Sequence, residues 1–168
     1  SDSQSIAYTY NEPTIFTEYA LDIMKLARKQ GLKNVWVSNG FMSVEALNEI
    51  LPLLDAINVD LKSMEDKFYQ QVCSARVQPV LENLSVIKKG GIHLEMTTLI
   101  IPMLSDDHKM LNKVAEFIVK ELGTEAHWHI SRFSPEISWD FPDLPATDLK
   151  TMDKVYDIGR QAGLKYVY

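Results

Sequence analysis

The sequence predicts an α/β protein whose strands form a partial, open TIM-like barrel of five to six parallel strands. Segments typical of strands alternate with segments typical of amphipathic helices along the whole chain. This alternation indicates right-handed β-α-β units and a parallel sheet. The number of strands is too small for a closed eight-stranded barrel. Polar residues follow most of the predicted strands, at the edge where parallel α/β proteins bind their ligands.

The predicted strands are short apolar runs that end at turn residues. They cover residues 5–10, 34–39, 56–62, 92–101, 127–133 and 164–168. The helices expected between them show apolar residues at helical spacing. They cover residues 14–31, 44–54, 65–89, 108–123 and 147–163.

Several helix details follow from single residues. The apolar face of the first helix is expected to carry Ile15, Tyr19, Ile23 and Leu26. The third helical stretch should break near Gln78 and Pro79, because proline removes a backbone donor and restricts the residue before it. Thr147 or Asp148 is expected to cap the last helix.

Composition favours one globular domain over residues 1–168. Hydrophobic residues make up 46% of the chain and the net charge is −6. This charge, without basic stripes, argues against nucleic-acid binding. No apolar run reaches the roughly 18 residues of a membrane span, so a cytoplasmic protein is expected. The single cysteine, Cys73, excludes an internal disulfide and a cysteine-pair metal site, and is interpreted as inert packing.

Polar side chains gather at the ends of five consecutive predicted strands. They are Asn11 and Glu12, Ser38 and Asn39, Asp60 and Lys62, Thr97 and Thr98, and finally His129, Ser131 and Arg132. Structural interpretations remain open for several of them. Glu12 fits a carboxylate at a helix N-terminus, and Gly40 fits a turn that needs positive φ. Asp60 and Lys62 share one strand face and fit a buried ion pair.

His127 and His129 share a strand face two residues apart. A His-x-His pair binds metal only with further ligands, and no third ligand is evident, so packing is the favoured interpretation. The loop at residues 134–146 is long and rich in aromatic residues. It fits either a lid or a packed surface loop.

Six motifs, in order and spacing, resemble one family. They are "YTYNEPT", "VSNG", "NVDLK", "PVLENL", "MTTLIIP" and "HWHISRFSP". Together they resemble the radical SAM enzymes related to pyruvate formate-lyase activating enzyme, and within these the branch named AmmeMemoRadiSam. The resemblance runs from about residue 5 to the last residue.

The resemblance implies a site for S-adenosyl-L-methionine (SAM) at the strand ends. Asn11 and Glu12 would hold the amino group of the methionine moiety, since a carboxylate and an ammonium form a charge-assisted contact. Ser38, Asp60 and the Asn58 carbonyl would bind a monovalent cation near the SAM carboxylate. The remaining cofactor-binding residues would be Asn39, Lys62, Ile100 (or its neighbour Ile101), Ser131 and Ser134. Members of this family often carry a histidine at the position of Ser134. The serine therefore changes the contact expected with the adenine of SAM.

The resemblance also implies a [4Fe–4S] cluster held by a Cys-x3-Cys-x2-Cys loop, which this sequence lacks. The chain is therefore expected to be an inactive fragment of a full-length parent, without its first strand and cluster loop. The exposed edge at residues 5–10 would then pair with another molecule or form a dimer.

The parent would cleave SAM reductively to a 5′-deoxyadenosyl radical that abstracts hydrogen from a substrate. That substrate would be a glycyl-radical enzyme, another protein or a small molecule, and the electron donor a flavodoxin or ferredoxin. Two alternatives remain open. One is an aldolase-type enzyme that uses Lys62 as a Schiff-base nucleophile, and the other is a noncatalytic interaction domain that uses residues 134–146.

Overall fold

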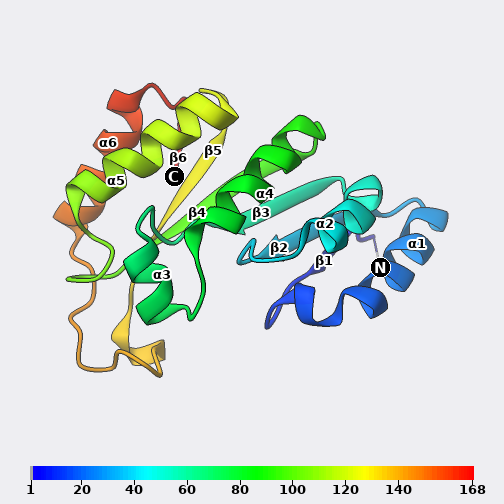
Figure 1. The fold of residues 1–168 in the computed structure, drawn as a ribbon, viewed down its shortest axis with the longest axis horizontal. Helices are drawn as coiled ribbons and strands as arrows, with labels where there is room; N and C mark the ends of the chain where they lie inside the picture. The colour runs from blue at the N-terminus through cyan, green and yellow to red at the C-terminus, as the bar shows by residue number, and fades with distance from the viewer. Residues whose placement is uncertain (1) are drawn as a thin grey trace. The chain divides into compact units, whose positions relative to one another are not determined.

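The computed structural model describes residues 2–168, which form two compact units. The first unit contains the chain up to Asp60 together with Gln78–Glu95. The second contains Leu61–Val77 together with Met96–Tyr168. Six strands form one open sheet in the order β1-β2-β3-β4-β5-β6, with parallel pairing (Figure 1). The predicted open, parallel α/β architecture is confirmed.

The first unit alternates strands and helices from its beginning. Its elements are β1 (Ser5–Tyr8), a 3₁₀ turn (Pro13–Phe16), α1 (Thr17–Lys29), β2 (Lys33–Ser38), α2 (Val44–Ile50) with a 3₁₀ turn (Leu51–Leu53), β3 (Ala56–Asp60) and most of α4 (Val77–Lys89). β1 pairs with β2 so that Tyr8 lies opposite Trp36, and β2 pairs with β3 so that Ser38 lies opposite Val59. These registers bring the carboxyl ends of the three strands to one edge of the sheet.

The face that α1 buries differs from the predicted one. Ile15, in the 3₁₀ turn before α1, is 76% exposed, and Tyr19 and Leu26 of α1 are 70% and 60% exposed. Ile23, the fourth residue of the predicted face, is half-buried. The residues of α1 that are buried are Ala20, Leu21, Met24 and Ala27. The helix carries apolar residues around more than one side, and periodicity alone does not say which side meets the sheet. The side with two alanines lets the helix backbone approach more closely.

The second unit contains the later strands and their helices. Its elements are α3 (Asp66–Val72), most of β4 (His93–Ile100), α5 (His108–Phe117) with a π-helical turn (Ile118–Leu122), β5 (His127–Arg132), a 3₁₀ turn (Pro135–Ile137), α6 (Leu149–Ala162) and β6 (Tyr166–Val167). Trp128 on β5 is fully buried. A Cβ atom at Gly159 of α6 would lie only 3.0 Å from its ring. The absence of a side chain at Gly159 therefore permits α6 to pack directly on Trp128.

Two helix boundaries refine the sequence prediction. The predicted break near Gln78 and Pro79 is displaced, because α3 ends at Val72 and α4 begins at Val77. Pro79 therefore lies in the first turn of α4, where the missing N–H has no intrahelical partner to lose. Asp148 is the N-cap of α6, since its carboxylate accepts a hydrogen bond from the N–H of Thr151 at 2.9 Å.

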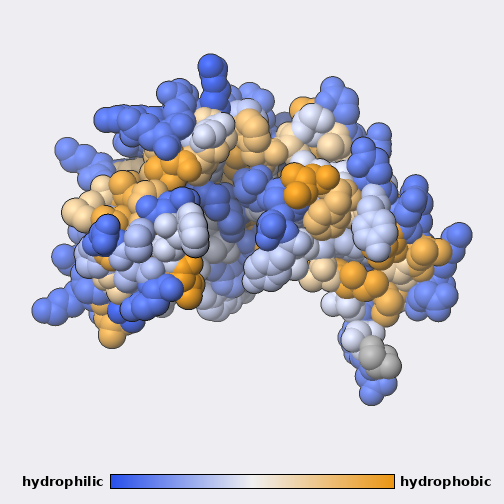
Figure 2. All heavy atoms as spheres, turned by 90° about the horizontal axis from the view of Figure 1, so that it is seen from below, coloured by the Kyte–Doolittle hydropathy of each residue, from blue (hydrophilic) through white to orange (hydrophobic). Residues whose placement is uncertain are grey.

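Hydrophobic side chains reach the surface at several places among hydrophilic ones (Figure 2). Among residues 2–168, no helix combines the length and apolar character needed to cross a bilayer.

Gly40 offers a direct test of how closely α4 and β3 pack on the turn after β2. Its φ is +72°, and an added Cβ would lie 2.6 Å from Cγ1 of Val59 and 3.2 Å from Cγ1 of Val80. We expect Gly40→Ala to lower the free energy of unfolding by about 1–2 kcal/mol through the left-handed backbone, and by a further ~1–3 kcal/mol through crowding. Urea unfolding measures the change.

Gly91→Ala is the matched control, because Gly91 has the same φ of +72° and no atom within 4 Å of an added Cβ. It should show only the backbone cost. Equal destabilisation by the two substitutions would contradict the proposed crowding at Gly40.

Candidate functional site

The carboxylate of Glu12 lies at the carboxyl ends of β1 and β2 and joins them. Its Oε1 accepts hydrogen bonds from Ser38 Oγ at 2.7 Å, from Thr14 Oγ1 at 2.7 Å and from the Thr14 N–H at 3.1 Å. Its Oε2 accepts one from the Asn39 N–H at 2.8 Å. The side chain caps the 3₁₀ turn that follows, so the interpretation of Glu12 as a carboxylate at a helix N-terminus is correct. The bonds to β2 give it a second, tertiary role.

The Oε2 atom of Glu12 retains acceptor capacity. Among the described residues, only the Asn39 N–H donates to it, whereas three donors, two of them from Thr14, converge on Oε1. Glu12 is half-buried and Asn11 beside it is exposed. The carboxylate is therefore fixed in position by protein donors and still open to one more donor.

The turn after β2 is built by Ser38 and Asn39. Ser38 is buried, and its hydroxyl accepts a hydrogen bond from the Gly40 N–H at 3.0 Å while donating to Glu12. The side-chain oxygen of Asn39 accepts from the Phe41 N–H at 2.8 Å. The side chain of Asn83 on α4 donates to the carbonyls of Gly40 and Met42 at 3.0 and 2.9 Å. The turn interpretation is thus confirmed, and the turn also supplies two donors to Glu12.

The end of β3 lies beside this turn by strand register. Val59 pairs with Ser38, so Asp60 follows at the level of the turn. Asn58 and Asp60 are both half-buried residues of β3. The structure therefore brings Glu12 and Ser38 into contact and places Asp60 on the neighbouring strand end. Lys62 belongs to the second unit, and its N–H donates to the hydroxyl of Tyr69 at 3.1 Å.

The predicted site residues of the second unit lie at the ends of β4 and β5. Ile100 is fully buried, and its carbonyl accepts a hydrogen bond from the Thr147 hydroxyl at 2.5 Å. Ser131 is a half-buried residue of β5. The Ser134 hydroxyl donates a short hydrogen bond to the carboxylate of Glu136.

The two histidines of β5 take part in ring stacking. His127 stacks on Tyr166 with ring centroids 4.5 Å apart and planes 3° apart, and His129 stacks on Tyr168 at 5.1 Å. Among residues 2–168, no group of three or more His, Cys, Asp or Glu side chains is arranged to hold a metal ion. Packing, the favoured interpretation of this pair, agrees with the stacked rings.

Cys73 follows α3 and is half-buried. Burial raises the pKa of its thiol, partly offset by the positive charge of Lys62. A raised pKa lowers the thiolate fraction at neutral pH and makes the thiol less reactive.

A sequence model of the radical SAM superfamily matches residues 2–118, more than half of the chain. The chain belongs to the radical SAM superfamily. The matched residues include both Glu12 and Lys62. Membership of this superfamily does not favour the interpretation as an aldolase-type enzyme or as a noncatalytic interaction domain.

Individual relatives agree with this assignment. An uncharacterized protein of Methanocaldococcus jannaschii is 40% identical over 163 residues, which are 97% of this chain and 47% of that protein. Pyruvate formate-lyase 1-activating enzyme of Escherichia coli is 23% identical over 108 residues, 63% of this chain and 44% of the enzyme. The chain thus spans about half the length, or less, of these curated relatives.

The fold of this radical SAM chain is also that of a solved structure. A domain of pyruvate-formate lyase-activating enzyme from Bacteroides vulgatus superposes with a TM-score of 0.84 at 17% identity, covering 99% of this chain and 98% of that domain. This likeness concerns the fold alone.

Sequence reasoning missed several buried hydroxyls that organise the radical SAM chain. Thr98 on β4 donates to the Leu61 carbonyl at 2.8 Å and accepts from the Trp128 indole N–H at 2.9 Å. Thr147 accepts from the Phe133 N–H at 3.1 Å and donates to Ile100. Thr98 was noted only as a polar residue on a strand and Thr147 only as a helix cap. No local signal distinguishes such threonines from exposed ones.

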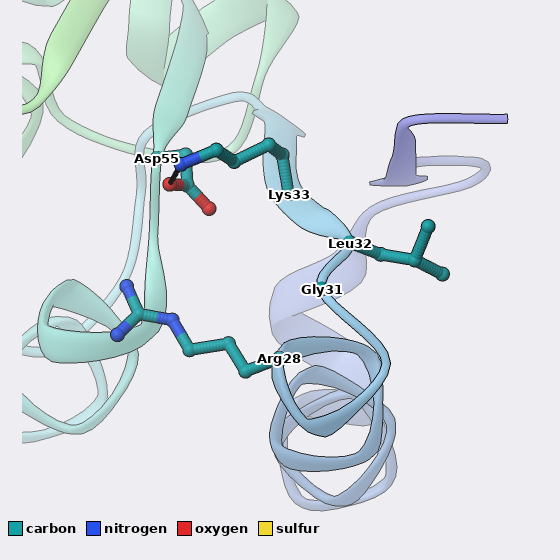
Figure 3. A pocket seen from close by; sticks show the side chains of 5 residues that line it. All are labelled: Arg28, Gly31, Leu32, Lys33 and Asp55. Carbon is teal, nitrogen blue, oxygen red and sulfur yellow. Dashed lines mark hydrogen bonds and ion pairs between the residues drawn. The ribbon is translucent and has the colours of Figure 1, made fainter.

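A pocket of about 290 Å³ lies at the opposite, amino-terminal ends of β2 and β3 (Figure 3). It is lined by Arg28, Gly31, Leu32, Lys33 and Asp55. Asp55 accepts hydrogen bonds from Lys33 Nζ at 2.8 Å and from the buried Asn34 N–H at 2.9 Å. In β/α barrels this edge serves stability, and catalysis occupies the carboxyl edge. We therefore assign Asp55 a structural role.

Two substitutions of Asp55 should distinguish the stability contributed by its hydrogen bond from the Asn34 N–H and by its ion pair with Lys33. The Lys33 ammonium, followed by the Asn34 N–H, holds the pKa of Asp55 below its ordinary value of 3.8. Asp55→Ala leaves the Asn34 N–H without an acceptor and should cost about 1–3 kcal/mol of unfolding free energy. Asp55→Asn keeps an acceptor and loses an exposed ion pair, so it should cost under about 1 kcal/mol.

The cost of Asp55→Asn should also depend on pH. Because the pKa of Asp55 is lower in the folded state, its ionised carboxylate contributes full stability at pH values above 3.8. This contribution is lost as the pH falls through the lower pKa of the folded state. Urea unfolding across this range should therefore show the two proteins converging in acid. A difference that stays constant with pH would contradict the assignment.

Proposed function

We propose that this chain is the SAM-binding part of a radical SAM enzyme that resembles the activating enzymes of glycyl-radical proteins. The observation that carries the proposal is the anchored carboxylate of Glu12. Three donors fix its Oε1 atom, while Oε2 accepts a single hydrogen bond from the Asn39 N–H. An ammonium group at Oε2 would form a charge-assisted hydrogen bond with a group that needs no reorganisation.

The neighbouring strand ends would hold the rest of the methionine moiety. Asn11 precedes Glu12 and would contribute to the ammonium site. Ser38, Asp60 and the Asn58 carbonyl offer oxygen ligands of the kind that a hard monovalent cation prefers, and such a cation would neutralise the SAM carboxylate. Asn39 would act through the N–H that orients Glu12.

In the second unit, Lys62, Ile100, Ser131 and Ser134 remain candidates for the adenosine side. Ile100 would contribute there through its backbone, since its side chain is buried. Ser134 would contribute with the hydroxyl that now binds Glu136.

The iron–sulfur cluster of the superfamily does not fit the residues present. A [4Fe–4S] cluster is held by cysteine thiolates, and the 168 residues contain only Cys73. Burial raises the pKa of that thiol, which is the opposite of what a ligand needs. We infer that the cluster ligands are not part of this chain and that the chain alone does not cleave SAM.

For the whole enzyme, we propose reductive SAM cleavage to a 5′-deoxyadenosyl radical that abstracts hydrogen from a protein substrate. The support is the similarity to proteins named pyruvate formate-lyase activating enzymes. The substrate would be a glycyl-radical enzyme or a related protein, with a flavodoxin or ferredoxin as electron donor, in the cytoplasm.

The role of Glu12 can be tested without catalysis. Isothermal titration calorimetry of SAM with the chain should show Glu12→Gln weakening binding by about 1.5–3 kcal/mol, the contribution of a charge-assisted hydrogen bond. That range corresponds to a decrease of roughly 10- to 150-fold in affinity. Far-UV circular dichroism and urea unfolding establish that the variant is folded.

Two controls distinguish ligand binding from structural damage. Thr14→Val removes one hydrogen bond to Oε1 and keeps the charge, so SAM affinity should change by less than about threefold. 5′-Methylthioadenosine lacks the amino-acid part of SAM, and its affinity should be equal in Glu12→Gln and the parent sequence. Unchanged SAM affinity in Glu12→Gln would remove Glu12 from the site.

A further inference from the structure

Two loops of the second unit expose large apolar side chains beyond the carboxyl ends of their strands. The β4 loop, residues 101–107, exposes Met103 (71%), and the β5 loop, residues 133–148, exposes Ile137 (89%) and Trp139 (95%). Figure 1 shows the β5 loop, in yellow and orange, extending away from α5 and α6. A contiguous patch of exposed apolar side chains often marks an interaction site, whereas single exposed apolar residues are common on protein surfaces.

The β4 loop is held in one conformation by polar contacts. The hydroxyl of the fully buried Ser105 accepts from the Ile101 N–H at 2.9 Å and donates to the Leu99 carbonyl at 2.8 Å. The carboxylate of Asp106 accepts from the N–H of Met103 at 3.0 Å. Met103 is held at φ 65°, a left-handed conformation that is uncommon for a residue other than glycine. The exposed Met103 side chain is thus presented by a fixed backbone.

The two ends of the β5 loop are tied together at its base. Thr147, which is almost fully buried, exchanges hydrogen bonds with the backbone of Phe133 and donates its hydroxyl to the carbonyl of Ile100. Its own carbonyl accepts from Arg132 Nε at 2.5 Å. The base of the β5 loop is therefore fixed to the end of β4, directly before the β4 loop begins at Ile101.

A hollow of about 200 Å³ adjoins the β4 loop. Its lining combines apolar side chains with polar ones; they are Phe68, Val72, Met103 and Leu104, and Glu65, Lys67 and Gln71. A hollow with both apolar and polar lining can take one apolar anchor of a partner and bond to the polar groups beside it.

Within the two loops, every charged side chain is a carboxylate. Between Phe133 and Leu149 the chain carries four carboxylates and no Lys, Arg or His, and the β4 loop adds two more. The six are Asp106, Asp107, Glu136, Asp140, Asp143 and Asp148. The Ser134 hydroxyl lowers the pKa of Glu136, and the Thr151 N–H lowers that of Asp148. Both stay charged throughout the neutral and mildly acidic range. Cations flank the loops: Lys67 lines the hollow, Arg132 lies at the base of the β5 loop, and Lys154 of α6 faces Asp148.

We propose that the two loops and the hollow beside α3 form a docking surface for a protein segment with apolar anchors flanked by Lys or Arg. The apolar groups would supply the affinity, and the carboxylates would select a basic segment and speed its association. This inference rests on the proposed function in one respect, since it identifies the segment as part of the enzyme's protein substrate.

Trp139 provides a local readout. The chain has three tryptophans, and the other two, Trp36 and Trp128, are fully buried. Acrylamide quenching of the free chain therefore reports on Trp139.

The probe is a fluorescein-labelled amphipathic peptide of leucine and lysine, and its counterpart is a peptide of leucine and glutamate. The lysine peptide should protect Trp139 from quenching and the glutamate peptide should not. Raising the salt from about 50 to about 300 mM should weaken binding, because screening shortens the range of charge interactions.

Variants locate the surface by fluorescence anisotropy of the labelled peptides. Trp139→Ala and Met103→Ala should each lower affinity for the lysine peptide about ten-fold or more. The pair Asp140→Asn with Asp143→Asn should lower it and reduce its salt dependence. The controls are Leu26→Ser, an exposed apolar residue of α1, and the pair Asp22→Asn with Glu49→Gln, which removes the same charge from the first unit. Neither control should change the affinity.

Three outcomes would overturn the proposal. They are equal binding of the glutamate peptide, equal loss in the control variants, and protection of Trp139 by self-association of the chain without peptide, seen in analytical ultracentrifugation. SAM titration of the same variants separates this proposal from the proposed function. Loss of peptide binding with SAM affinity unchanged locates the docking surface apart from the SAM site.

Discussion

Parallel strand pairing is the constraint on which the placement of every functional residue depends. Each helical crossover returns the chain in the same direction, so strand ends that are distant in the sequence meet at one edge. In the first unit this brings the end of β1 to the turn after β2. A carboxylate at that point must bond to the N–H and hydroxyl groups that the next strand presents. The order and direction of the strands therefore determine which side chains meet at the candidate site.

Glu12 has a structural role in the fold, and the proposed function gives the same side chain a second role. Its Oε1 atom accepts hydrogen bonds from Thr14 and Ser38, and its Oε2 atom accepts one from the Asn39 N–H. A carboxylate held in this way loses little conformational freedom when a cation arrives, which favours binding. The structural interpretation of Glu12 is therefore compatible with the proposed ligand interpretation, in which the same contacts would hold the carboxylate ready for the ligand.

The second unit uses buried hydroxyls for a comparable purpose. Thr98 joins Leu61 to Trp128, Thr147 closes the base of the β5 loop, and Ser105 holds the β4 loop. Each hydroxyl both donates and accepts, so it satisfies two backbone or indole groups that burial would otherwise leave unpaired. Loops fixed at their bases can present exposed groups such as Trp139 from a defined position. This combination of buried polar bases and exposed apolar tips distinguishes these loops from ordinary surface connections.

The amino-acid sequence by itself determined the order of strands and helices, the open parallel sheet and the family, because period, caps and motifs are local signals. It also predicted that Glu12, Ser38 and Asp60 lie at one edge of the sheet, since parallel strands place their ends side by side. Only the tertiary structure decided which side of α1 meets the sheet, because Ile15, Tyr19 and Leu26 carry the same periodic signal as the side that is buried. It also decided that Pro79 lies in the first turn of a helix that it was expected to interrupt, and that Thr147 anchors a loop. Such choices depend on which surfaces pack together and which donors face which acceptors, and these relations arise between segments that no local pattern connects.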